Sequence, residues 1–172
     1  GDGQFTANLD GLEASGKYYV RAFAITDEAI VYSPAMMLQT PDETGVINLS
    51  QHGTANSYII SRAGTYSFDC SVKGNSNESV GTPTEAVVVW ETFNTADAVA
   101  VGSIIASVEL DGNTVRFTTS EIFTPGNALI AVKDKYGIIW SWHIWATDLD
   151  TDVDAQLYQS GAIMMDRNLG AL

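Results

Sequence analysis

The residues best placed to do chemistry lie on an aromatic segment, Ile138–Ala146. In an extended strand, alternation places Trp140, Trp142 and Ile144 on one face and His143 and Trp145 on the other. The first face is more apolar and is expected to form core, which leaves Trp145 and His143 partly exposed. An exposed indole beside a hydrogen-bonding group can stack on a sugar ring while the polar group reads its hydroxyls. Trp145 and His143 are therefore candidate ligand-binding residues. The alternative is that Trp145 packs under a loop or on a neighbouring domain.

An acidic run follows this segment. Four aspartates alternate with other residues, at Asp148, Asp150, Asp152 and Asp154, and carboxylate oxygens are the ligands that Ca²⁺ prefers. The run departs from an EF-hand loop, because Val153 stands where the turn glycine belongs and Gln159 where the bidentate glutamate belongs. A solvated acidic loop is the alternative to a weak calcium site, and no other cofactor is expected.

Catalysis has little support in the sequence. His52 and His143 are the only histidines, and neither lies in a G-x-S-x-G or H-E-x-x-H pattern. The 21 acidic residues make pairs of carboxylates inevitable, so such pairs do not indicate a glycosidase. We expect no enzymatic activity and no catalytic residues.

The single cysteine, Cys70, excludes an intrachain disulfide and a cysteine-based metal site. It alternates with Phe68 and Val72, so it is expected to point into a core as a small hydrophobe. No His, Lys or Arg lies beside it in sequence to lower its pKa, which disfavours a reactive thiol.

Composition and charge narrow the class of protein. With 172 residues, 45% of them hydrophobic, the chain can bury a core without a metal or disulfide. A net charge of −13 would repel a nucleic-acid backbone, so no nucleic-acid partner is expected. No apolar run reaches the roughly 18 residues that a membrane helix needs, so direct membrane insertion is not expected either. Because the sequence opens with Gly1-Asp2-Gly3, we expect it to be a piece of a longer protein.

Nearly every periodic segment repeats with period two, as a strand does. The segments are rich in Val, Ile, Tyr, Trp and Thr and are separated by turn residues. Asp111-Gly112 and Lys133–Gly137 are the clearest hairpin turns, because Gly accepts positive φ. Many short strands with turns between them predict an all-β protein, an antiparallel β-sandwich with immunoglobulin- or fibronectin-like strands. A boundary is predicted near residues 40–45, where Pro, Gly and acidic residues separate two strands.

The segment Leu12–Ala24 loosely matches the L-x-x-G-x-x-Y-x-V-x-A pattern of fibronectin type III domains. Residues 1–42 therefore resemble the second half of such a domain, with its first four strands missing. The resemblance implies that Tyr18 is a corner tyrosine whose hydroxyl bonds backbone a few residues upstream. The incomplete unit would either pack on the rest of the chain or pair with a neighbouring copy.

Residues 43–172 resemble a β-sandwich module of Bacteroidetes cell-surface proteins, among them fimbrillin-like and adhesin-like lipoproteins. The resemblance rests on motifs such as Gly53–Ile60, Gly64–Phe68, Val72–Asn75 and Trp140–Trp145. The tail from Met165 to Leu172 resembles the opening of a Fibrobacter succinogenes major paralogous domain, a lectin-like module. The family often has Cys where this chain has Ser57, so no disulfide is expected.

These resemblances imply a place on the cell surface, at the extracellular face of the outer membrane, with the anchor outside this chain. Two functions remain open at this point. The first is a non-catalytic structural spacer whose partners are neighbouring domains of the same protein. The second is an adhesive, carbohydrate-binding module that uses an exposed aromatic patch on a glycan or a host or cell-surface protein.

Overall fold

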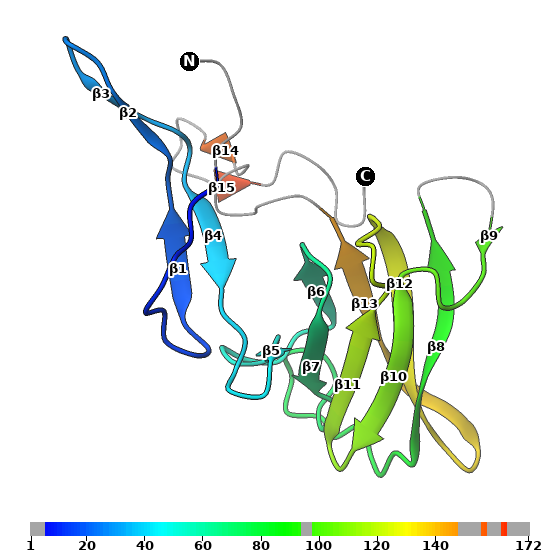
Figure 1. Ribbon diagram of the computed structural model, residues 1–172. Helices are drawn as coiled ribbons and strands as arrows, with labels where there is room; N and C mark the ends of the chain where they lie inside the picture. The colour runs from blue at the N-terminus through cyan, green and yellow to red at the C-terminus, as the bar shows by residue number, and fades with distance from the viewer. Residues whose placement is uncertain (1–5, 94–97, 148–155, 158–162, 165–172) are drawn as a thin grey trace.

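The computed structural model describes residues 6–93, 98–147, 156–157 and 163–164. Within these ranges every regular element is a β-strand, and the two main parts are a twisted hairpin and a two-sheet sandwich (Figure 1). The prediction of an all-β sandwich is confirmed. No helix that could cross a membrane is found in the described part of the chain.

The hairpin is built from two interrupted arms. Strand β1 (Lys17–Val20) pairs with β4 (Met36–Gln39), and β2 (Phe23–Ile25) pairs with β3 (Ile30–Tyr32), all antiparallel. Between the pairs, two residues of one arm face three of the other, and Ser33 N donates to the Ala22 carbonyl at 2.9 Å. Pro34 lies in this irregular step, where its missing N–H costs no ladder bond. The result is one long, bent hairpin.

The predicted tyrosine contact is present in this hairpin. The backbone N–H of Glu13 donates to the Tyr18 hydroxyl at 2.7 Å, five residues upstream as expected for a corner tyrosine. The Tyr18 ring is half-buried. The contact fixes the approach of the chain to β1.

One sheet of the sandwich has the order β10-β11-β7-β5. These strands are β10 (Ile105–Asp111), β11 (Thr114–Thr119), β7 (Thr65–Asp69) and β5 (Val46–Asn48). The predicted turn at Asp111-Gly112 joins β10 to β11, with Gly112 at a φ of +58°. Glycine suits that position because it adopts positive φ without a steric cost.

The other sheet has the order β6-β13-β12-β8-β9. Its strands are β6 (Ser57–Ile60), β13 (Gly137–Ala146), β12 (Gly126–Asp134), β8 (Glu85–Thr92) and β9 (Ala98–Val99). The predicted hairpin at Lys133–Gly137 joins β12 to β13. Pairing is antiparallel except that β6 runs parallel to β13, as β5 does to β7 in the first sheet. The parallel pairs lie at the first or last position of each strand order, so both are edge pairs.

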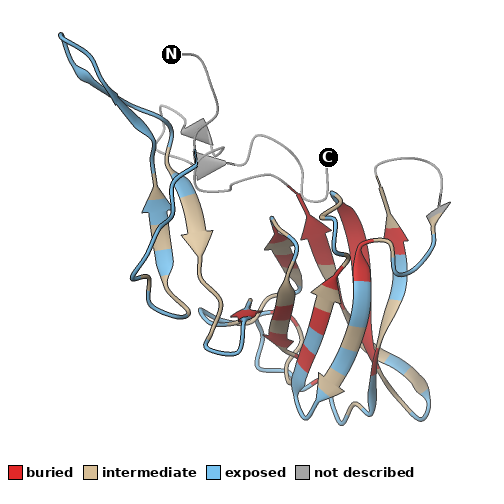
Figure 2. Ribbon diagram, viewed as in Figure 1, coloured by how far each residue is buried: buried red, intermediate tan, exposed pale blue. Residues whose placement is uncertain are grey.

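An aromatic cluster joins the two sheets. Phe68 of β7 lies with ring centroids 5.1 Å from Tyr58 of β6 and 5.1 Å from Trp142 of β13. Phe117 packs on Tyr66 at 5.4 Å within the first sheet. Cys70 is buried in the same cluster, as predicted, and burial raises the pKa of its thiol to about 11. In Figure 2 the buried residues gather in the sandwich, whereas the hairpin is mostly exposed.

The sandwich begins at an Asp42 turn. The Asp42 carboxylate accepts hydrogen bonds from Thr44 N at 2.8 Å, Thr44 Oγ1 at 2.7 Å and Val46 N at 2.9 Å. The Thr44 hydroxyl and the Val46 amide lower the pKa of Asp42 from its usual value. The turn falls at the predicted boundary between residues 40 and 45.

A small ladder, β14 (Gln156–Leu157) with β15 (Ile163–Met164), completes the described strands. The predicted tail that begins a second module, Met165–Leu172, lies outside the described residues.

Candidate functional site

The structure corrects the expectation for Trp145. Its side chain is 0% exposed, so it offers no platform for a ligand. Trp145 does lie on the face of its strand opposite the core residue Ile144, but it is flanked by Asn127 of β12 and Ile59 of β6. Alternation assigns residues to the two faces of a strand, but it does not predict whether each face is buried. At this end of β13 both faces are buried. The Trp145 indole nitrogen has no hydrogen-bond partner among the described residues.

His143 lies on that same outer face of the five-stranded sheet and is half-buried. Its ring joins three strands: Nδ1 is 2.9 Å from Ser57 Oγ on β6, and Nε2 is 2.8 Å from Asn127 Oδ1 on β12. Because the Asn127 oxygen can only accept, the arrangement assigns the proton to Nε2 and makes Nδ1 the acceptor of the Ser57 hydroxyl. Burial lowers the pKa of His143, which favours the neutral ring.

Sequence reasoning missed Trp90. Its indole is 41% exposed and shares the outer face with His143. The cause is a bulge in β8: Leu129 pairs with Trp90 while the next residue, Ile130, pairs with Val88. Val89 is the extra residue, and it shifts the alternation of everything after it by one position. The polar Glu91 at the end of an apolar run was the available signal that alternation breaks there.

The same bulge turns Glu91 inward. Its carboxylate is buried and accepts three backbone hydrogen bonds, from Ser103 N at 2.8 Å, Ile104 N at 2.9 Å and Ile105 N at 2.8 Å. These bonds hold the segment that enters β10 against the second sheet. The carboxylate is therefore fully occupied by structure and is not presented to a ligand.

A second bulge, in β13, interrupts the alternation of the aromatic segment near its start, although strict alternation would place Ile138 on the core face with Trp140. Val132 pairs with Trp140 and Lys133 with Ile138, so Ile139 is the extra residue. Ile138 is consequently exposed, while Ile139 and Trp140 pack partly against the core. The face predicted to be core therefore begins at Trp140.

Four residues form one row across the outer face, one from each of four neighbouring strands. In register they are Ser57, His143, Leu129 and Trp90. The flanking positions on β12 and β13 are Ala131 and Ser141. The row combines one exposed ring with an oriented hydroxyl–imidazole pair.

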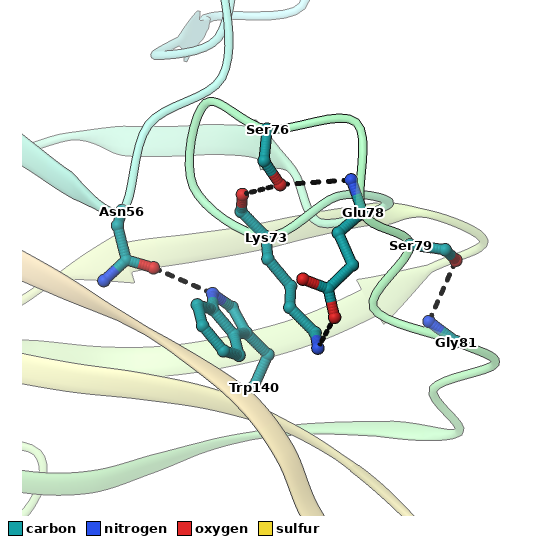
Figure 3. A network of polar contacts seen from close by, with 7 residues as sticks. All are labelled: Asn56, Lys73, Ser76, Glu78, Ser79, Gly81 and Trp140. Atoms are coloured by element: carbon teal, nitrogen blue, oxygen red, sulfur yellow. Dashed lines mark hydrogen bonds and ion pairs between the residues drawn. The ribbon is translucent and has the colours of Figure 1, made fainter.

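Trp140 lies at a different place, in a network with the loop after β7 (Figure 3). Its indole N–H donates to Asn56 Oδ1 at 2.8 Å, and Lys73 Nζ lies 5.2 Å from the ring centroid. Lys73 also pairs with Glu78, while the Ser76 hydroxyl links the Lys73 carbonyl to the Glu78 amide. The indole N–H and one ring face are thus engaged within the protein, so the network anchors the loop.

A groove of about 290 Å³ separates the hairpin from the edges of the sandwich. It is lined by β4 residues such as Met36 and Leu38 and by Ile47, Ile59 and Tyr66. Arg62 is its charged lining residue, and its guanidinium donates to the Gln39 carbonyl.

The predicted calcium ligands Asp148, Asp150, Asp152 and Asp154 lie outside the described residues. Among the residues that are described, no three His, Cys, Asp or Glu side chains come together as a metal-binding group. His52 is exposed in a turn and is not a member of the row. Comparison with protein families, with curated proteins and with solved structures finds no match to this chain.

Proposed function

We propose that the chain is a non-catalytic structural spacer of a surface-anchored bacterial protein of the adhesin-like kind. Its partners are then the neighbouring domains of that protein, and its location is the cell surface. The sequence resemblances motivate the family and the location. The spacer role rests on the joint between the hairpin and the sandwich.

The observation that carries the proposal is a set of hydrogen bonds that fixes the base of the hairpin. Gln51 of the sandwich donates to the Ser15 carbonyl at 3.0 Å and accepts from Gln39 at 3.2 Å. Arg62 donates to the carbonyl of the same Gln39. Since Ser15 and Gln39 belong to opposite arms of the hairpin, both arms are tied to one sandwich. A spacer needs such a joint, because it must hold its two ends at a set distance.

The outer-face grouping supports a non-catalytic role. Ser57, His143 and Asn127 contain the residue types of a nucleophile, a base and an orienting group. The orienting group is a neutral amide, and no carboxylate contacts the ring among the residues that the structure describes. Burial also lowers the pKa of His143, which makes the ring a weaker base than a solvent-exposed imidazole.

Double electron–electron resonance, which measures the distance between two spin labels, tests whether the joint holds the hairpin at a fixed distance from the sandwich. The variant Glu28→Cys/Glu121→Cys carries labels at the exposed hairpin turn and on an exposed sandwich loop. Cys70 stays unlabelled because it is buried and its thiol has a raised pKa. A single narrow distance distribution is expected, and Arg62→Ala in the same background should broaden it. A broad distribution in the parent chain would contradict the spacer.

A further inference from the structure

The outer face of the five-stranded sheet has a chemical character unlike that of the rest of the chain. The side chains in its centre are uncharged: Ser57, His143, Leu129, Trp90 and Ser141. The charged pair of this face, Lys133 and Glu85, lies at one end of it and is joined at 3.0 Å, so the two charges offset each other. An uncharged polar face is unexpected on a chain whose net charge is −13.

The aromatic group of this face is placed there by the backbone. Without the bulge at Val89, alternation would point Trp90 inward and Glu91 outward. The bulge exposes an indole and removes a carboxylate from the same face. Bulges commonly re-aim side chains beside functional sites.

Polar groups lie within reach of this indole. Trp90 and His143 are two strands apart, which corresponds to about 10 Å at the usual strand spacing. Leu129 lies between them and provides apolar surface. The Ser57 hydroxyl donates to His143 and keeps its lone pairs for another donor. Ser141, opposite Ala131 in the ladder, has a side-chain hydroxyl with no hydrogen bond among the described residues.

From this arrangement we propose that the row Ser57–His143–Leu129–Trp90 binds a neutral saccharide, with one sugar ring stacked on Trp90. The apolar faces of sugar rings fit an indole and a leucine, and their hydroxyls fit the serines and the fixed imidazole. The absence of net charge in the row favours a neutral glycan over an anionic one. The site keeps His143 from the predicted pair, has Trp90 in place of Trp145, and does not depend on the spacer role.

Affinity electrophoresis of the whole chain tests the proposal. The gels contain soluble β-glucan, xyloglucan, galactomannan or α-mannan, with polygalacturonate as the anionic comparison. We expect retardation in at least one neutral gel. The variant Trp90→Ala should weaken the affinity for that polysaccharide about tenfold, which is the contribution of one good aromatic contact. Tyr136→Ala, which removes a ring that is 84% exposed at the β12–β13 turn, is the matched control and should migrate like the parent.

Three outcomes overturn the proposal: no retardation in any neutral gel, retardation in polygalacturonate alone, or equal retardation of Trp90→Ala and the parent chain. A measurement on the unaltered chain guards against a misfolded variant. An oligosaccharide of the retarding polymer should shift the NMR signals of the Trp90 indole N–H and the His143 ring nitrogens. Unchanged signals from both would also overturn it. The spin-label distances are unaffected by either result, so the saccharide site and the spacer can fail separately.

Discussion

The hairpin and the sandwich are built from similar residues but use them differently. Phe23 and Ile25 of the hairpin are 62% and 72% exposed, whereas Phe68 and Ile130 of the sandwich are 0% exposed. Both regions follow strand alternation and both have good backbone pairing. The difference is the number of layers, because a single two-stranded sheet has nothing to pack its faces against. Pairing therefore specifies a strand, and only a second layer turns its side chains into a core.

The first test of this comparison is a pair of matched substitutions. Phe68→Ala removes a ring that contacts Tyr58, Phe117 and Trp142, and it should lower the free energy of unfolding by about 3–5 kcal/mol. Phe23→Ala removes an exposed ring that contacts Tyr32 and should cost at most about 1 kcal/mol. Urea unfolding followed by tryptophan fluorescence reports the sandwich transition of both variants, because all four tryptophans lie in β8 and β13. Similar losses would mean that the two regions share one core after all.

Glu91 tests whether polar groups also stabilise the sandwich. Glu91→Gln removes the charge from three backbone hydrogen bonds and should lower the free energy of unfolding by about 2–4 kcal/mol. The control is Glu109→Gln, an exposed side chain of β10 whose ion pair with Arg116 is long at 3.7 Å and should contribute little. Urea midpoints of the two variants give the comparison. A stable Glu91→Gln chain would show that the β10 entry segment needs no such anchor.

Tyr18→Phe acts on the hairpin alone. Loss of the Glu13–Tyr18 hydrogen bond should weaken the base of the hairpin by about 1 kcal/mol and leave the sandwich transition in place. Hydrogen exchange of the Glu13 amide is the direct readout and should accelerate. Tyr32→Phe, also in the hairpin, serves as the control because Tyr32 is exposed and its hydroxyl contacts no backbone group in the part of the chain that the structure describes. A shifted sandwich midpoint would indicate that the two regions unfold together.

The smallest effect concerns the pH dependence that His143 gives the sandwich. Burial lowers the pKa of His143 in the folded state, so the folded chain binds fewer protons than the unfolded one near the ordinary histidine pKa. Its contribution to stability is complete above about pH 6.5 and is lost as pH falls through the lowered folded pKa. Thermal midpoints between pH 7.5 and 5.5 should decline in the parent chain and decline less in His143→Gln. Identical slopes would contradict the assignment to His143.

The sequence was sufficient for most of the strands and for several local contacts. Alternation and turn residues located β10, β11 and the β12–β13 hairpin, since both are properties of neighbouring residues. The burial of Cys70 was predictable for the same reason, from its alternation with Phe68. The Tyr18 hydroxyl bond was an expectation from the resemblance to fibronectin type III domains rather than from the residues alone.

The candidate site needed the tertiary structure. Trp90 faces outward and Glu91 inward because of one extra residue at Val89, and a bulge is a property of two paired strands rather than of one. His143 meets Ser57, 86 positions away, only because β6 pairs with β13. The burial of Trp145 likewise depends on what covers both faces of its strand. The sequence determined which residues alternate, and the pairing and stacking of sheets decided which of them reach solvent, because those contacts join residues distant in the chain.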